Sequence, residues 1–337
     1  MGGRPGCTRL TIGVLACSGA AVMLGAGACS SPSLLITPVS AQRDLQERVL
    51  MRDSWLAFDK IALIDVTGVL SNAPKRQLFG TGEHPVSLLL EQLNKARNDR
   101  AVKAVVLRIN SPGGGVTASE LMHDEITHFK RSGKPVIAVL MDVAASGGYY
   151  IACACDEIMA QPSTVTGSIG VIMQLFDVSG TMEIVGVHAD AVTSGAFKDA
   201  GSPFRSMRPE ERDIFQTIVN DMYDRFIEVV DRGRPDLDET TVRTLGDGRV
   251  YSAKQALDAG LIDRIGTLRE AVELAKQRAG VKRGRLVVYQ RPFDYRSTYY
   301  ANAATRSNQF NLLNIDLTDW AGSPTPRFMY LWTPGRP

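Results

Sequence analysis

The alternation of short apolar runs with amphipathic stretches limits the fold of this chain more than any other feature. KIALIDVTGVL (60–70), VKAVVLRIN (102–110) and PVIAVLM (135–141) are apolar runs of strand length, and residues 86–99 and 116–132 between them have helical spacing. Strands that alternate with helices at this interval pair in parallel, because each helix carries the chain back along the sheet. The sequence therefore predicts an α/β fold with a parallel sheet.

Further segments extend the pattern beyond the third predicted strand. DEIMAQ (156–161) and IGVIMQ (169–174) are short apolar strands, and residues 187–195 continue the strand pattern. Residues 208–234 predict a long helix, because their apolar positions recur at intervals of three and four. Residues 252–280 predict two more helices, which give the fold a helical C-terminal part.

The N-terminal segment differs in character from the rest of the chain. Arg4 and Arg9 precede an uncharged run at 10–28, and Cys29 follows it. A basic start before an apolar run is typical of an export signal, and this run is also long enough to span a bilayer. Cys29 stands in a context that resembles a bacterial lipobox, with Ala26 where leucine is usual. A lipoprotein, a signal anchor and a cleaved signal all remain open, and each predicts a chain on the extracytoplasmic side of the cell envelope, at or near the membrane.

Charge, cysteine and histidine content argue against several kinds of ligand. Lys and Arg number 38 and Asp and Glu 36, and this balance gives no reason to expect nucleic acid as a partner. After the N-terminal segment only Cys153 and Cys155 remain, and their apolar surroundings predict buried free thiols. The four histidines form no ligand cluster, so we expect neither a metal nor another cofactor.

The glycine-rich segment NSPGGG (110–115) directly follows one predicted strand and precedes a helix. Successive glycines leave backbone N–H groups uncovered at a helix N-terminus, where these groups can hold a negative charge. The spacing is neither that of a P-loop nor that of a dinucleotide site. An oxyanion hole for acyl transfer uses the same physics, and a tight turn that needs glycine dihedrals is the structural alternative.

Ser146 lies among the small residues of AASGG (144–148), after the third predicted strand and before a short apolar helix. It therefore lies at the same edge of the sheet as the glycine segment, where α/β sheets place their sites. A serine here is either a helix N-cap or a nucleophile. No histidine is near in sequence and the G-x-S-x-G pattern is absent, so a base for this serine has to be a lysine or a carboxylate.

Lys198 is the candidate base, in the glycine-containing segment TSGAFKDAGSPFR (193–205). A lysine acts as a base only when it is neutral, and burial lowers the pKa of lysines from about 10.4. A solvated loop lysine is the alternative reading. Ser168, in TGSIGV (166–171), offers a hydroxyl that could hold the amine, or it is a turn serine.

Four blocks of sequence, in this order and spacing, resemble the signal peptide peptidase A (SppA) family in its short form with one catalytic domain. Any one block is a weak signal, whereas four in order are specific, and together they cover roughly residues 58–280. The blocks are RINSPGGGVTASE (108–120), AASGGYYIACACDEIMAQPSTVTGSIGV (144–171), TSGAFKDAGSPFRSMRPEER (193–212) and GRVYSAKQALDAGLIDRIG (248–266).

The resemblance implies a ClpP/crotonase-like fold of repeated β-β-α units and a serine–lysine peptidase. It also implies a homo-oligomeric ring, in which the serine and the lysine of one site come from adjacent protomers. The implied substrates are apolar peptides such as signal peptide remnants, bound in a pocket for small or aliphatic side chains. The residues that match the family's site are the nucleophile Ser146, the base Lys198, the lysine-positioning Ser168 and the oxyanion-hole residues Gly113, Gly114 and Gly147.

The predicted organisation is a signal or anchor segment at 1–29, a linker at 30–57, the peptidase domain at 58–286 and an extended C-terminal arm at 287–337. The last of these ends in PRFMYLWTPGRP, and one hypothesis is that it docks in or near a neighbour's cleft as a self-substrate. Two other functions remain open: a crotonase-type acyl-CoA enzyme, which the fold would permit, and a membrane-tethered scaffold without turnover.

Overall fold

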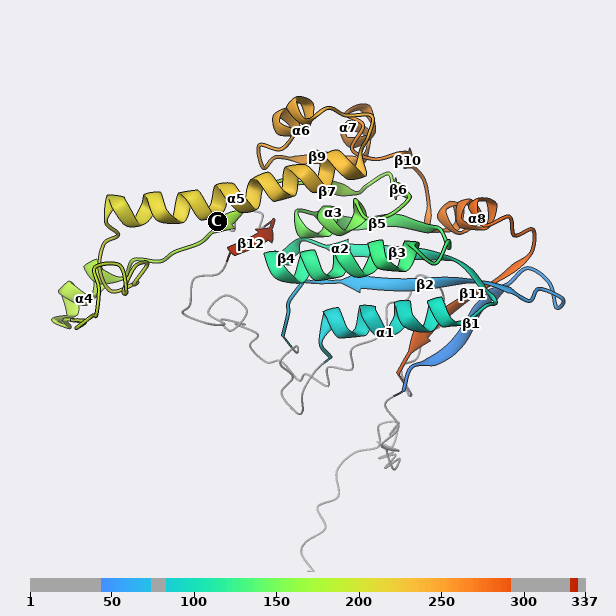
Figure 1. Ribbon diagram of the computed structural model, residues 1–337, viewed down its shortest axis with the longest axis horizontal. Coiled ribbons are helices and arrows are strands. Elements are labelled where there is room, and N and C mark those ends of the chain that lie inside the picture. Colours follow the sequence, from blue (N-terminus) through green and yellow to red (C-terminus); the bar gives the residue numbers. More distant parts are fainter. Residues whose placement is uncertain (1–43, 74–82, 292–327, 333–337) are drawn as a thin grey trace, which may run out of the picture. The chain divides into compact units, whose positions relative to one another are not determined.

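The computed structural model describes residues 44–73, 83–291 and 328–332. Within these ranges the chain forms a mixed α/β fold with a nine-stranded, mostly parallel sheet and a second sheet of three short strands (Figure 1). The larger sheet contains β1 (Gln46–Arg52), β2 (Asp59–Thr67), β3 (Val102–Ser111), β5 (Val136–Ala145), β6 (Glu157–Ala160), β7 (Val165–Gly167), β9 (Val250–Ser252), β10 (Arg264–Ile265) and β11 (Gly284–Gln290). The smaller sheet contains β4 (Gly113–Gly115), β8 (Ile172–Met173) and β12 (Phe328–Leu331). The helices are α1 (Pro85–Asn98), α2 (Val116–Lys130), α3 (Gly147–Ala152), α4 (Ser179–Val185), α5 (Pro209–Gly233), α6 (Glu239–Leu245), α7 (Ala253–Asp258) and α8 (Leu268–Arg278).

The central strands of the larger sheet are buried on both faces. They pair in parallel in the order β11-β2-β3-β5-β6, and β1 joins antiparallel at the β11 edge. Side chains alternate across the sheet, so Ala62 and Ile64 join the core beneath α1 and α2, while Ile61 and Leu63 pack with α8. Burial on both faces explains why these strands have nearly continuous apolar sequences.

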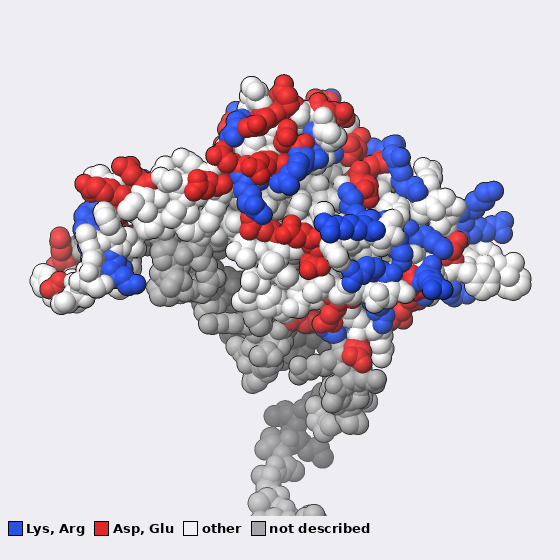
Figure 2. All heavy atoms as spheres, viewed as in Figure 1, with Lys and Arg blue, Asp and Glu red and all other residues white. Residues whose placement is uncertain are grey.

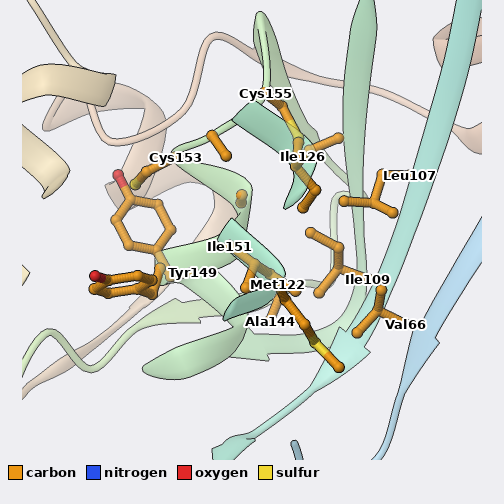
Figure 3. Packing of buried hydrophobic residues seen from close by; sticks show 14 of the residues in the cluster. Val66, Leu107, Ile109, Met122, Ile126, Ala144, Tyr149, Ile151, Cys153 and Cys155 are labelled. Carbon is orange, nitrogen blue, oxygen red and sulfur yellow. The ribbon is translucent and has the colours of Figure 1, made fainter. Parts of the chain in front are cut away.

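The larger core cluster fixes the short helix α3 that follows β5. Figure 3 shows Ile151 of this helix beside Met122 and Ile126 of α2, next to Leu107 and Ile109 of β3. All of these side chains are 1% exposed or less. Because close-packed interiors resist displacement, the turn between β5 and α3 is held on a rigid support.

The C-terminal end of α5 is buried, whereas the residues between β8 and this helix are almost all partly or fully exposed. Phe226, Ile227, Val229 and Val230 are buried near the end of this helix. Residues 172–212, which we call the arm, contain a single buried residue, Glu211. The arm includes α4 and leads into the exposed start of α5 (Figure 1). It therefore lacks an apolar core of its own.

The structure confirms the α/β architecture and the long helix predicted near 208–234. Three details of the predicted organisation need correction. Strand β1 lies within the expected linker at 30–57, because it pairs with β11, and β11 itself crosses the expected boundary at 286/287. Residues 187–195 form no strand, because their apolar side chains are exposed and nothing in the described ranges pairs with them.

Other parts of the predicted organisation fall outside the described residues. They include the N-terminal segment with Cys29, residues 30–43 and most of the extended C-terminal segment expected at 287–337. Among the helices that are described, none combines the length and apolar character needed to cross a membrane.

Figure 2 shows acidic and basic side chains interspersed over the face in view.

Candidate active site

Ser146 occupies the turn between β5 and α3 in a strained conformation. Its φ of 54° and ψ of −119° lie in a region that serine rarely adopts. The turn is held from both sides, because Ser146 N donates to Gly167 O at 2.7 Å and Tyr150 N donates to Ser146 O at 2.9 Å. The residue is completely buried, and its Oγ has no hydrogen-bond partner among the described residues. Such strain and such an unpaired hydroxyl are typical of functional sites.

The hydroxyl of Ser146 does not cap the helix that it precedes. Ser146 stands at the N-cap position of α3, yet its side chain makes no capping hydrogen bond. A structural N-cap serine is favoured because its Oγ accepts a backbone N–H of the first turn. The geometry therefore removes the simpler of the two readings that the sequence left open for Ser146.

The glycine segment folds against the Ser146 turn. Gly113 has a φ of 100°, and a Cβ on it would lie 2.7 Å from Gly147 N. A Cβ on Gly147 would in turn lie 3.2 Å from Gly113 Cα and 2.4 Å from Ser119 Oγ. Only glycine fits at these positions, so part of the need for small residues beside Ser146 comes from the packing of the chain on itself.

The three glycines that we expected to donate to an oxyanion differ in their backbone N–H groups. Gly113 N already donates to Ser111 Oγ at 3.1 Å. Gly147 is the first residue of α3, so its N–H has no acceptor within the helix and points out of the helix N-terminus. Gly114 lies next to Gly113 on β4. The geometry therefore favours the N–H of Gly147 as the donor to a developing oxyanion, with the N–H of Gly114 as the second candidate. The N–H of Gly113 is less suitable because it already donates to Ser111 Oγ.

Strand β12 crosses the glycine segment as an extended peptide would. It pairs antiparallel with β4 on one side, where Tyr330 lies opposite Gly114, and with β8 on the other. Trp332 N also donates to Pro112 O at 2.8 Å. A Cβ placed on Gly147 would be 3.2 Å from Tyr330 O. The chain thus lays its own C-terminal strand over the turn that carries Ser146, in the manner of β-strand addition.

The side chain of Tyr330 fills an aromatic pocket beside this turn. Its ring stacks on Tyr150 at 5.1 Å between centroids and lies 4.7 Å from the ring of Phe226. Tyr330 Oη donates to Met222 O at 2.9 Å, so the polar end of the ring is also satisfied. The space beside the turn therefore holds a large aromatic side chain of the chain itself, while the expected substrate pocket for small or aliphatic side chains stays a prediction.

Ser168 lies beside the same turn and faces an open cleft. It follows Gly167, the residue that accepts the hydrogen bond from Ser146 N, and has a positive φ of 50°. The cleft measures about 400 Å³ and is bordered by β12 and by the middle of α5. Its lining residues are Ser168, Gly170, Val171, Ile172, Val219, Asn220, Tyr223, Gly246, Asp247, Gly248 and Leu331.

Lys198 is not brought into contact with Ser146 in the single chain. It lies in the arm and is exposed, and its Nζ makes no hydrogen bond or ion pair in the part of the chain that the structure describes. Ser146 Oγ likewise has no partner there. The structure thus gathers the serines and glycines of the predicted site and leaves the lysine apart from them.

The remaining predictions about ligands concern cysteines and metals. Cys153 and Cys155 are free and buried, as predicted, and burial raises the pKa of Cys153 to about 12 and that of Cys155 further. Within the described ranges no group of histidine, cysteine and carboxylate side chains could hold a metal ion.

The glycine segment gives a first testable prediction. A Cβ at Gly114 would lie 2.0 Å from Leu70 O, which is fixed by Gly115 N at 2.8 Å. Gly114→Ala should therefore lower the free energy of unfolding by about 1–3 kcal/mol, the usual cost of overpacking. The matched control is Gly115→Ala, where the nearest atom is 3.8 Å away and the change should cost less than about 1 kcal/mol. Urea unfolding of both variants measures the difference, and equal losses would contradict the close approach.

Two comparisons with family models place the chain among peptidases. The model of peptidase family S49 matches residues 128–282, and that of Clp protease matches residues 75–166. The S49 match includes Ser146, Ser168 and Lys198, and the Clp protease match includes the glycine segment and Ser146. The observed α/β fold agrees with the ClpP/crotonase-like architecture expected from the sequence.

Individual relatives agree with the family models. A relative from Enterococcus faecium carries the name signal peptide peptidase SppA. It is 38% identical to this chain over 68% of this chain and 67% of its own length. Protease 4 of Haemophilus influenzae is 38% identical over 65% of this chain, and the chloroplastic serine protease SPPA of Arabidopsis thaliana is 36% identical over 69%. The chain spans 35% of the length of each of these last two relatives.

Proposed function

The chain belongs to peptidase family S49 and is a serine protease, and we propose that Ser146 is its nucleophile and Lys198 its general base. The observation that carries this assignment is the Ser146 turn: a buried Oγ without a partner among the described residues, on strained backbone, with an extended strand lying over it. Strain and lost hydrogen bonds are kept at a site when they expose a reactive group. Lys198 is the base because it lies within the S49 match and no histidine forms a hydrogen bond with Ser146 Oγ in the described ranges.

The site is completed by a second copy of the chain. Among the described residues neither Ser146 Oγ nor Lys198 Nζ has a partner, although each needs one for proton transfer. The open cleft at Ser168 adjoins the turn and offers room for a lysine side chain. Ser168 then holds the incoming amine next to Ser146 Oγ. Burial in that cleft is what would keep a lysine neutral.

The arm has the surface expected of a subunit contact. Ile184 is 87% exposed, Val185 66% and Val192 104%. Large apolar side chains exposed to this extent on a segment without an apolar core favour a subunit contact. Each arm in a ring would pack on the next protomer and deliver Lys198 there, so that every contact is of the head-to-tail kind.

The parts then perform acyl transfer. Neutral Lys198 accepts the Ser146 proton while Oγ attacks a peptide carbonyl carbon. The oxyanion that forms is held by Gly147 N–H and the glycine segment. The C–N bond breaks as Lys198 returns the proton to the leaving amine, which leaves an acyl-enzyme. A water molecule, deprotonated by the same lysine, then releases the acid and regenerates Ser146.

The substrate is an extended, apolar peptide bound along β4 in place of β12. Main-chain pairing with β4 fixes its direction, and the aromatic pocket of Tyr150 and Phe226 receives one large side chain. Membrane-derived peptides such as signal peptide remnants fit this chemistry, and the name of the Enterococcus faecium relative supports it. The export-type N-terminus and Cys29 favour an enzyme tethered to the extracytoplasmic face of the membrane.

Labelling with a fluorophosphonate tests this proposal. The reagent phosphonylates only activated serines, whose oxygen attacks phosphorus and displaces fluoride, so it should modify the peptide that contains Ser146 and no other, at a rate that rises with pH as the base loses its proton. Ser146→Ala should abolish labelling and Lys198→Ala should slow it by about 10²-fold or more. Intact-mass and peptide mass spectrometry report the site. A folded, assembled protein that stays unlabelled would contradict the proposal and favour the catalytically silent scaffold.

The crotonase-type acyl-CoA enzyme is the weaker alternative. It shares the fold, but the family comparisons are to peptidases. Turnover of an acyl-CoA ester by Ser146→Ala, with no peptide hydrolysis by the wild type, would reverse this preference.

A further inference from the structure

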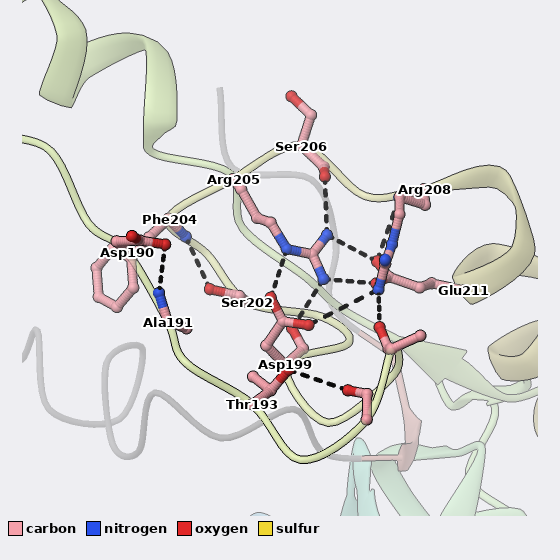
Figure 4. A network of polar contacts seen from close by, with 12 residues as sticks. Asp190, Ala191, Thr193, Asp199, Ser202, Phe204, Arg205, Ser206, Arg208 and Glu211 are labelled. Carbon is pink, nitrogen blue, oxygen red and sulfur yellow. Dashed lines mark hydrogen bonds and ion pairs between the residues drawn. The ribbon is translucent and has the colours of Figure 1, made fainter.

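Glu211 is an exception in the arm. Its side chain has no exposed area, although the arm contains no other buried residue. The cover comes from Arg205 and Arg208, and both guanidinium groups contact its carboxylate (Figure 4). A carboxylate shielded from water is stable only when charged donors replace the lost water. A charge network around Glu211 therefore organises a segment that has no apolar core.

Arg205 links Glu211 to the residue that follows Lys198. Its Nη1 donates to Glu211 Oε2 at 3.0 Å and its Nη2 to Oε1 at 2.5 Å. On its other side, Nε donates to Asp199 Oδ2 at 2.7 Å and Nη2 to Asp199 O at 3.2 Å. One guanidinium thus holds both the side chain and the backbone of Asp199 against the start of α5.

Arg208 links the same carboxylate to the residues before Lys198. Its Nε donates to Glu211 Oε1 at 2.8 Å and its Nη2 donates to Ala196 O. The guanidinium also lies over the ring of Phe197, 5.5 Å from the ring centre. Because planar guanidinium groups form several directed contacts at once, the two arginines fix position as well as charge.

Lys198 therefore lies between two anchored positions. Ala196 O and Phe197 are held by Arg208, and Asp199 is held by Arg205. Lys198 contributes only its backbone, whose N–H donates to Gly195 O at 3.1 Å. The loop is fixed on both sides, while the ammonium group that it carries has no partner in the described residues.

We infer that Asp199, Arg205, Arg208 and Glu211 form a clamp that presents Lys198 to the Ser146 turn of a neighbouring copy, and that these four are positioning residues of the peptidase. This inference rests on the proposed role of Lys198 as the base. A general base works only when its nitrogen is held near the proton that it accepts, and a displacement of about 1 Å costs about 10²-fold in rate. A loop without a core cannot supply that precision by packing, so the clamp has to supply it.

The clamp stays charged over the whole range in which a lysine base would titrate. Hydrogen bonds from Arg205, and then from Arg208, lower the pKa of Glu211 to about 2. The same contact with Arg205 lowers the pKa of Asp199. With depressed pKa values, both carboxylates are ionised in the folded arm from about pH 5 upwards, and the contribution of Glu211 is lost only as the pH falls through its own pKa of about 2. A rise of activity between pH 6 and 10 therefore reports the base and not the clamp.

The test replaces clamp residues one at a time in the full-length, assembled enzyme. Glu211→Gln keeps the shape and removes the charge, and we expect kcat for a fluorogenic peptide to fall by about 10²-fold with KM nearly unchanged, because β4 and the aromatic pocket are untouched. Arg205→Lys keeps one positive charge but loses the fork, and we expect a smaller fall, of about 10-fold. The matched control is Glu210→Gln, the same change at an exposed neighbour in the same helical turn, which should leave kcat at the wild-type level.

Two further readouts separate this inference from simpler explanations. Light scattering gives the oligomeric mass, and the rate of fluorophosphonate labelling gives the reactivity of Ser146 as a function of pH. The clamp predicts normal mass and slow labelling in both Glu211→Gln and Arg205→Lys. If labelling falls only in proportion to the loss of assembly in both variants, the network is merely structural and the inference is wrong. If Lys198→Ala is inactive while Glu211→Gln is normal, the clamp fails and the proposed base stands, whereas an active Lys198→Ala overturns the base itself.

Discussion

Ser146→Ala and Lys198→Ala should each lose at least about 10³-fold of peptidase activity, and the two inactive proteins should recover activity when they assemble together. The loss follows from removing the nucleophile or the base. The recovery follows from the separation of the two groups, because Ser146 Oγ and Lys198 Nζ both lack partners in the part of one chain that the structure describes. A site formed by the serine of one protomer and the lysine of its neighbour is intact whenever the first carries Lys198→Ala and the second carries Ser146→Ala. In randomly mixed rings that is about a quarter of the sites.

Co-expression with two different affinity tags, followed by sequential purification, isolates the mixed assemblies. The substrate is a fluorogenic peptide with a large apolar residue before the reporter. The control pairs Ser146→Ala with the double variant Ser146→Ala/Lys198→Ala, a mixture in which no arrangement yields a complete site. Mixed assemblies that remain as inactive as this control would show that serine and lysine of one site belong to the same chain.

The fold could be predicted from the sequence because its central strands and helices have strong, unmixed patterns. The apolar runs at 60–70, 102–110 and 135–141 can be satisfied only by burial on both faces of a parallel sheet. The strand β1 and residues 187–195 were predicted wrongly because their sequence patterns are weak. The strand β1 has alternating partial burial at the sheet edge, and residues 187–195 alternate without any buried face. Edge strands and exposed arms depend on tertiary partners, which a local pattern does not contain.

The site was predictable where short spacing and backbone geometry decide it. Ser146, Gly113 and Gly147 follow adjacent parallel strands, so their meeting at one edge of the sheet could be inferred. The aromatic pocket could not be predicted, because its walls, Tyr150 of α3 and Phe226 of α5, are far apart in the sequence. Only the position of the Tyr330 ring between them identifies the pocket. The clamp around Glu211 could be predicted only in part. The place of Glu211 in the first turn of a helix follows from Pro209, but its pairing with Arg205 and Arg208 does not, because the segment before the helix has no periodic pattern. Long-range contacts between unlike elements leave no signal in one sequence.

Ending the chain after residue 327 should raise kcat/KM for peptides by about 10-fold or more and reduce stability. In the intact chain, β12 occupies both the pairing edge of β4 and the aromatic pocket, the two features that we assign to substrate. Competition by a tethered strand is strong because its effective concentration is in the millimolar range. Its loss also exposes the pocket that the completely buried Tyr330 fills, and removal of a buried aromatic side chain typically costs about 3–5 kcal/mol.

A synthetic peptide RFMYLW, which corresponds to residues 327–332, provides the matching experiment in trans. It should inhibit the shortened enzyme competitively, and the same peptide with Tyr replaced by Ala should bind at least about 10-fold more weakly, because the aromatic contacts with Tyr150 and Phe226 are lost. Unchanged kcat/KM after truncation, together with no inhibition by the peptide, would mean that substrate does not bind along β4.

Intact mass of the wild type and of Ser146→Ala then distinguishes two roles for β12. Tyr330 O lies close to both Gly113 and Gly147, the region where the oxyanion of a substrate would form. If the strand is a self-substrate, the wild type loses its C-terminal residues and Ser146→Ala retains them. If it is an inhibitory strand, both proteins keep the same C-terminus, and the activity of the wild type rises only when the residues after 327 are removed. Because the aromatic pocket holds Tyr330 in either case, the two outcomes differ in whether the bond that follows it reaches Ser146 in a reactive geometry.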